Sequence, residues 1–229
     1  MPLPLYLAMT GAEISTNALP SQLAYMACHF SPYHTGLSNL PESLPPHSLL
    51  ILNDQIPVDQ HDPDRICRQL SAFCEKHRVS GLLLDFERPK EVLTLQIAQA
   101  LSASLSCPVA VTEAYAEVEG CCVLLLPRPY EKPEAVAGRW PGRKLWLELS
   151  TEAVQIRVDA QGAHIQDLDL PMELPHYHAP LATHYQTSLR EDHVRFQLSR
   201  TREDLETLLS QAEGLGFTCG IGLFQELGK

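Results

Sequence analysis

Two acidic residues close an apolar run that reads Gly81-Leu82-Leu83-Leu84-Asp85-Phe86-Glu87-Arg88-Pro89. Successive side chains of a strand point to opposite faces, so Asp85 and Glu87 share one face with Leu83. Two carboxyl groups held close together raise each other's proton affinity, and one then stays protonated near neutral pH as a general acid. This spacing predicts acid–base chemistry. The alternative is that both carboxylates form structural ion pairs, for example with Arg88.

Further polar side chains follow other apolar runs of strand length. In a parallel barrel, residues at the carboxyl ends of the strands line one mouth, where active sites lie. The substrate-contact candidates chosen on this basis are Asn53, Asp54, Glu113, Tyr115, Glu148 and Glu226. Because loops are polar in any globular protein, the alternative for each residue is a solvated loop position.

The elements that must position these residues alternate between strands and helices. Apolar runs predict strands at residues 3–9, 23–30, 48–53, 81–86, 108–112, 122–126, 145–149 and 219–224. Most runs are continuous rather than alternating, which is typical of parallel strands covered on both faces. Residues 62–77 and 90–105 have helical spacing, with Asp62 as N-cap and Pro63 at the first helical position. This alternation predicts a (β/α)8 barrel of the α/β class, with an open α/β sheet as the alternative.

The pattern changes after Ser150. Alternating residues at 153–158, a Gln161-Gly162 turn, residues 163–168 and residues 193–198 predict antiparallel strands, with a loop at 170–184. A helix is predicted to begin after Thr201. We therefore expect one barrel domain over residues 1–229, with an antiparallel insert at 151–199 between the seventh and eighth strands. Because 229 residues is short for such a barrel, some crossover helices are expected to be short or missing.

The composition narrows the classes of function. There are 17 basic and 28 acidic residues, a net charge of −11, which argues against nonspecific nucleic-acid binding. No signal peptide or membrane-spanning run is evident, so we expect a cytoplasmic protein without a membrane span. The 7 cysteines contain no C-x-x-C pair, and His176, His178 and His184 are interpreted as loop residues. No metal or cofactor is expected, and the oligomeric state is left open.

The run Gly81–Pro89 resembles a motif of glycoside hydrolase family 18, the chitinase-like barrels. That family carries D-G-x-D-x-D-x-E on its fourth strand, and the run here also falls on the fourth predicted strand. The segment Gly220-Ile221-Gly222-Leu223-Phe224 is similar to the family's closing G-x-x-x-W strand, with Phe224 in place of tryptophan. The family commonly has an antiparallel insert between strands seven and eight. The layout is most similar to compact members associated with spores and cell walls.

The resemblance implies substrate-assisted hydrolysis of an N-acetylglucosamine-type linkage. Glu87 would protonate the glycosidic oxygen, Asp85 would hold the acetamido group, and Phe224 would lie under the sugar. Three departures stand against this: Leu83 replaces the inner aspartate, Pro127-Arg128-Pro129 replaces a Tyr-Asp pair, and Phe224 replaces tryptophan. The alternatives are a noncatalytic barrel that binds a saccharide or protein, and an unrelated small α/β enzyme.

Overall fold

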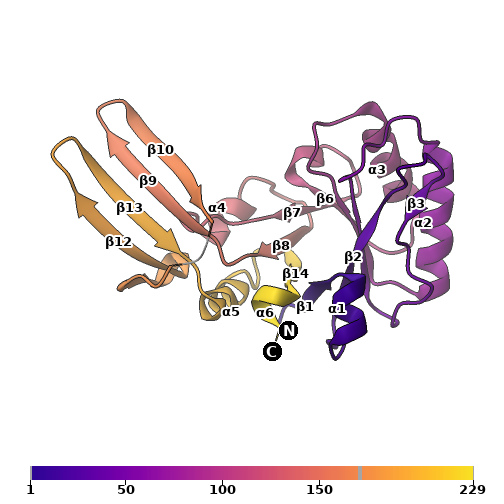
Figure 1. Cartoon of the computed structure of the whole chain (residues 1–229), viewed down its shortest axis with the longest axis horizontal. Coiled ribbons are helices and arrows are strands. Elements are labelled where there is room, and N and C mark those ends of the chain that lie inside the picture. The colour runs from indigo at the N-terminus through magenta and orange to yellow at the C-terminus, as the bar shows by residue number, and fades with distance from the viewer. Residues whose placement is uncertain (1, 170–171, 229) are drawn as a thin grey trace.

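The computed structural model describes residues 2–169 and 172–228, and its main feature is a closed barrel of parallel strands (Figure 1). The barrel strands, in chain order, are β1 (Leu5–Met9), β2 (Leu23–Phe30), β4 (Leu49–Asn53), β5 (Gly81–Asp85), β6 (Val109–Thr112), β7 (Cys122–Leu125), β8 (Leu145–Leu149) and β14 (Phe217–Leu223). Strand β14 pairs with both β8 and β1, and β1 pairs with β2, which closes the ring. The predicted (β/α)8 barrel is therefore confirmed, and an open sheet is excluded.

Helices cover the barrel unevenly. Three have ten or more residues in the described part of the chain: α2 (Pro63–His77), α3 (Val92–Ser104) and α5 (Arg202–Gln211). The others are α1 (Gly11–Thr16), α4 (Pro133–Ala137) and α6 (Phe224–Leu227). Between β2 and β4 the described chain has only the two-residue strand β3 (Leu37–Ser38) and loops. The short chain thus accommodates a full ring of strands by shortening the helices.

The longest helix begins where its capping residues predict. The carboxylate of Asp62 accepts a hydrogen bond from the backbone N of Asp64 at 3.0 Å, and Pro63 occupies the first turn. Its apolar stripe, Ile66, Leu70 and Phe73, is buried against the outside of the barrel. The N-cap of α5 is Thr201, as predicted, and its hydroxyl and backbone N both donate to the carboxylate of Asp204.

The barrel interior is filled by side chains rather than open. Its apolar residues include Tyr6, Ala24, Leu49, Ala110, Cys122, Trp146 and Cys219 in the lower layers, with Ile51, Leu83, Leu124 and Ile221 above them. Gly81 is required at the foot of β5, because a Cβ there would lie 2.8 Å from the ring of Trp146. The indole therefore fills the space that a larger residue at position 81 would need.

An antiparallel sheet lies between β8 and α5 in the chain and extends away from the barrel (Figure 1). Its strands are β9 (Ala153–Asp159), β10 (Gly162–Leu168), β11 (His176–His178), β12 (Thr183–Leu189) and β13 (His193–Ser199), paired in the order β10-β9-β13-β12-β11. The predicted hairpin is confirmed. The prediction of a continuous loop at 170–184 is wrong, because β11 pairs with the start of β12 on either side of a short turn, Ala179–Leu181. Residues 170–171 of that prediction lie outside the described residues.

The helices described are all too short or too polar to cross a lipid bilayer.

Candidate active site

A cavity of about 280 Å³ opens at the carboxyl ends of the barrel strands. This end is where the loops after parallel strands meet, and it is where barrels of this class hold their ligands. The cavity walls combine apolar residues of the upper barrel layer with polar residues of the loops: Ala8, Met26, Ile51, Asn53, Asp54, Gln55, Leu83, Asp85, Glu87, Leu124, Glu148, Leu149, Ser150, Ile221, Gly222 and Leu223.

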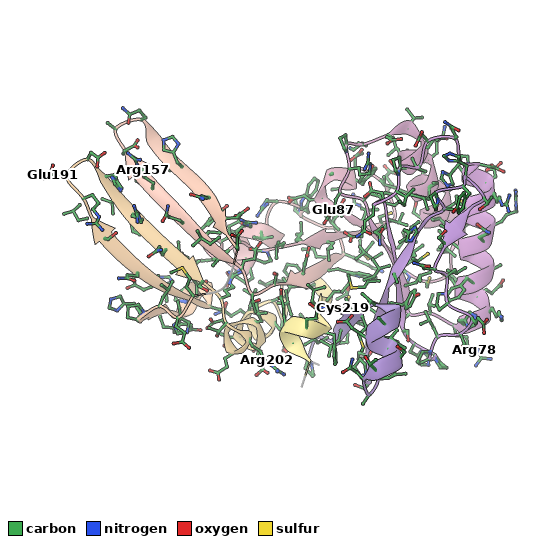
Figure 2. The ribbon with its side chains drawn as sticks, in the orientation of Figure 1. Arg78, Glu87, Arg157, Glu191, Arg202 and Cys219 are labelled. Atoms are coloured by element: carbon green, nitrogen blue, oxygen red, sulfur yellow. The ribbon has the colours of Figure 1, made fainter. Side chains whose placement is uncertain are left out.

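The turn that carries Glu87 is held on three sides. Phe86 is buried, and its ring packs against those of Phe30 and Tyr115 at centroid distances of 5.9 and 5.5 Å. The buried carboxylate of Asp54 accepts hydrogen bonds from the backbone N of Glu87 at 3.0 Å and from that of Arg88 at 3.1 Å. The hydroxyl of Thr112 donates to the carbonyl of Phe86 at 3.0 Å. The backbone of Glu87 is thus fixed while its side chain stays exposed at the barrel mouth (Figure 2).

Among the described residues, no lysine or arginine lines the cavity beside its acidic side chains. In the same part of the chain, no donor hydrogen-bonds to the side chains of Asp85, Glu87 or Glu148. Burial, together with the charges of Glu87 and Asp54, raises the pKa of Asp85 to about 6. Burial and repulsion from Asp85 and other carboxylates raise the pKa of Glu148 to about 7. Near pH 7 Glu148 is therefore partly protonated, whereas an ordinary carboxylate is fully ionised there.

Replacing Glu148 by glutamine is expected to flatten the dependence of stability on pH. Since the pKa of Glu148 is raised from 4.5 to about 7, the folded chain binds this proton more tightly than the unfolded chain. The resulting stabilisation is complete below pH 4.5 and is lost as pH rises through about 7. A charged Glu148 at pH 8 costs up to about 3 kcal/mol, which Glu148→Gln removes.

Urea denaturation at pH 5 and pH 8 measures this effect. Glu148→Gln should exceed wild type in stability at pH 8 and approach it at pH 5. The exposed Glu119, which hydrogen-bonds to no described residue, provides the matched control Glu119→Gln, whose profile should follow wild type. If the stability of wild type, Glu148→Gln and Glu119→Gln changes equally between pH 5 and pH 8, the raised pKa of Glu148 is contradicted.

Five of the residues chosen from the sequence lie on this cavity: Asn53, Asp54, Asp85, Glu87 and Glu148. Asn53 and Asp54 also have local structural contacts. The side-chain amide of Asn53 donates to the carbonyl of Met26 at 3.2 Å, and its oxygen accepts from the backbone N of Gln55 at 3.3 Å. Both side chains shape the wall and the loops around it.

The other four lie elsewhere. Glu113 accepts from the guanidinium of Arg139 at 3.2 Å and from the indole of Trp140 at 3.1 Å on the outer surface. Tyr115 is fully buried, with its hydroxyl 2.6 Å from that of Thr94. Glu226 accepts from the backbone N of Thr151 at 2.8 Å in a neighbouring hollow. Phe224 begins α6 and lines a separate hollow, while Leu223 occupies the cavity wall.

Arg128, which stands where the resembled motif has Tyr-Asp, is engaged away from the cavity. Its guanidinium pairs with Glu152 at 2.9 Å and with Asp167 at the base of the insert sheet. Its loop is held by the buried Arg200, which donates to the carbonyls of Pro127 and Arg128. The 127–129 loop thus joins the barrel to the insert and adds no polar side chain to the cavity.

Eleven cavity residues were not among the sequence candidates: Ala8, Met26, Ile51, Gln55, Leu83, Leu124, Leu149, Ser150, Ile221, Gly222 and Leu223. Gln55 and Ser150 lie within two positions of a strand end, so choosing polar residues at the carboxyl ends of strands could have found them. The other nine are apolar residues or glycine, and their residue types indicate no particular chemistry. The histidines 176 and 178 share one face of the insert sheet while His184 lies on the other, and no group of metal-ligating side chains occurs among the described residues.

Comparisons with known proteins resolve the fold but not the sequence family. No protein-family model matches the sequence, and no curated protein matches it significantly. Among solved structures, the Bacillus cereus spore cortex-lytic enzyme SleL is similar, with a TM-score of 0.60 and 11% identity over 99% of this chain and 71% of that one.

Two chitinases are similar along nearly their whole length. The family 18 chitinase of Cycas revoluta, solved with (GlcNAc)3, has a TM-score of 0.59 and 10% identity over 96% of this chain and 94% of its own. The chitinase of Chromobacterium violaceum has a TM-score of 0.58 and 8% identity, covering 99% and 96%. The chain therefore has a barrel of the kind seen in family 18 chitinases and SleL.

Proposed function

We propose that the chain is a glycosidase that cleaves an N-acetylglucosamine-type glycan by substrate-assisted hydrolysis. The observation that carries this proposal is the joint placement of Asp85 and Glu87 on one cavity at the mouth of the barrel. Their spacing along β5 and the turn after it matches the motif described above. The likeness in fold to chitinases, one of them solved with a GlcNAc oligosaccharide, supports a saccharide as the ligand.

In this proposal each carboxyl group has a separate task. Glu87, exposed at the mouth, donates its proton to the glycosidic oxygen, so that the leaving sugar departs as a neutral alcohol. The acetamido carbonyl oxygen of the substrate attacks the anomeric carbon as that bond breaks. Asp85, deeper in the cavity, accepts a hydrogen bond from the acetamido N–H and balances the positive charge that develops there. Glu87, now a carboxylate because it has given up its proton, then deprotonates the water that attacks the anomeric carbon and opens the cyclic intermediate.

A noncatalytic barrel that binds a saccharide or a protein is the second candidate. Leu83 and the 127–129 loop favour it, because neither supplies the polar groups that the resembled motif places beside the acid. Under this alternative, Asp85 and Glu87 accept hydrogen bonds from a bound ligand without bond cleavage.

The two candidates are separated by one set of measurements on the wild-type chain. Fluorogenic chitooligosaccharides and peptidoglycan fragments are tested for turnover at high enzyme concentration, and binding of the uncleaved oligosaccharides is measured by titration calorimetry. Turnover supports the glycosidase. Binding without turnover supports the second candidate. If the chain shows no binding and no turnover, both glycan functions are contradicted.

A further inference from the structure

Cys74 and Cys107 form a pair of thiols outside the candidate active site. Cys74 lies in the last turn of α2, and Cys107 lies in the loop that joins α3 to β6. The thiol of Cys74 donates a hydrogen bond to the sulfur of Cys107. The chain beside each cysteine is fixed, because the backbone N of Val79 donates to the carbonyl of Cys74 at 3.2 Å and that of Leu82 donates to the carbonyl of Pro108 at 3.0 Å. The two sulfurs are therefore held in contact.

The pair borders a hollow of about 470 Å³ at the amino ends of β5 and β6. This is the end of the barrel opposite the acidic cavity, and Arg78, which also borders the hollow, lies well away from Glu87 (Figure 2). Cys74 is 5% exposed, whereas Cys107 is only partly buried. The remaining polar side chains of the lining are His47, Ser71, Glu75, Ser80, Ser104 and Ser106. A small polar molecule that enters the hollow thus reaches the sulfur of Cys107 more readily than that of Cys74.

The hydrogen bond gives the two sulfurs different proton affinities. It lowers the pKa of Cys107, because it stabilises a thiolate there, and it raises the pKa of Cys74, which burial raises further. The carbonyl oxygens at the end of α2 also disfavour a negative charge on Cys74. Of the two cysteines, Cys107 therefore carries the thiolate, which is the nucleophilic form.

The other five cysteines lack this combination. All seven lie within the described part of the chain, and burial raises the pKa of Cys28, Cys67, Cys121, Cys122 and Cys219. Cys122 and Cys219 also lie near each other, but they are 3% and 6% exposed inside the barrel lumen. Cysteines that react with oxidants have a low pKa, are accessible and lie beside a second cysteine. In this chain only Cys107 meets all three conditions.

We propose that Cys74 and Cys107 form a dithiol site that reacts with hydrogen peroxide, with Cys107 as the attacking cysteine and Cys74 as the resolving one. The sulfur of Cys107 attacks one peroxide oxygen, the O–O bond breaks, and the other oxygen leaves as hydroxide, which becomes water. The sulfur of Cys74 then attacks the sulfenic acid on Cys107. The S–S bond forms, and the hydroxyl leaves with the proton of Cys74 as a second water. Two thiols are thus oxidised to one disulfide while one peroxide is reduced to two waters.

The disulfide closes a ring over residues 74–107. This ring contains β5, the turn of Glu87 and α3, so oxidation ties together the two ends of the segment that carries the acidic pair. Cross-linking a ring of this length removes conformations from the unfolded chain, which raises the melting temperature by roughly 5–15 °C. Because the sulfurs are already in contact, little strain offsets this gain.

Thiol titration in denaturant after brief treatment with hydrogen peroxide tests the site. Wild type should fall from seven free thiols to five, and dithiothreitol should restore all seven. Cys107→Ser should keep its six thiols, because it lacks the attacking sulfur. Cys67→Ser makes the same chemical change on α2, at a thiol whose pKa is raised, and is the matched control that should lose two thiols like wild type.

Cys74→Ser separates the two roles. Without a resolving thiol, Cys107 should stop at the sulfenic acid, which dimedone captures as an adduct visible in the intact mass. Circular dichroism before treatment checks that each variant folds. A wild-type chain that keeps all seven thiols overturns the proposal, and so does equal thiol loss in Cys107→Ser and Cys67→Ser. A melting temperature of wild type that fails to rise on oxidation overturns it as well.

Discussion

Glu87→Gln is expected to lower the rate of the proposed glycan hydrolysis by about 10²- to 10⁴-fold, the contribution of a positioned general acid. Glutamine keeps the size of the side chain but has no proton to donate to the leaving oxygen. The backbone contacts from Asp54 to residues 87 and 88 do not involve the replaced group, so the turn stays in place. We therefore expect the loss to fall on kcat, with KM little changed.

Steady-state kinetics with an unmodified chitooligosaccharide, whose leaving sugar needs protonation, measure both constants. Glu119→Gln makes the same chemical change on an exposed residue outside the cavity, and its kcat should equal that of wild type. A substrate whose leaving group needs no protonation should lose much less rate in Glu87→Gln. Equal turnover by wild type and Glu87→Gln would rule out this residue as the acid.

The position of the acidic pair was predictable because the information is local. The run from Gly81 is apolar until Asp85, and alternation along a strand then determines which side chains point inward. The same rule places Glu148 correctly, since it lies within β8 and on the same side as Trp146, which fills the lumen. Where the backbone remains extended, counting residues is enough to assign a face.

The rule fails one or two residues beyond a strand, where the backbone turns. After β6 the chain enters a 3₁₀ turn, Glu113–Tyr115, which directs Glu113 to the surface and Tyr115 into the outer core. Phe224 was expected at the cavity from the resemblance rather than from alternation; β14 ends at Leu223, α6 begins at Phe224, and alternation from Ile221 gives the inward position to Leu223. These turns depend on tertiary packing that no local pattern encodes.

The insert shows a different limit. Alternation predicted its hairpin, because two paired strands with a tight turn are specified locally. Strand β11 was missed because it has only three residues in a segment rich in proline and histidine. The sequence also could not show that side chains on one face of the insert sheet, such as Ile165 and Leu189, stay exposed among the described residues. An alternating strand indicates which face is apolar but not what covers it.

Leu83 occupies the place of the inner aspartate in the resembled motif. Leu83 is 3% exposed and lies in the upper apolar layer of the barrel with Ile51, Leu124 and Ile221. An aspartate there would lie one inward position below Asp85, whose pKa is already raised. We expect Leu83→Asp to lower the free energy of unfolding by about 4 kcal/mol at pH 8, because it buries a charge beside unbalanced carboxylates.

Leu83→Asn separates the charge from the loss of packing. Both variants remove the same apolar volume, so the asparagine variant should lose about 3 kcal/mol at any pH. The aspartate variant should recover toward that value as pH falls, because protonation removes its charge. Denaturant unfolding at pH 5 and pH 8 gives the free energy of unfolding of each variant at each pH. An unchanged stability for Leu83→Asp at pH 8 would show that position 83 is not in a closed apolar layer. If the expected loss is found, the leucine is part of a barrel interior built for it, and burial together with neighbouring carboxylates raises the pKa values of Asp85 and Glu148 without an inner aspartate.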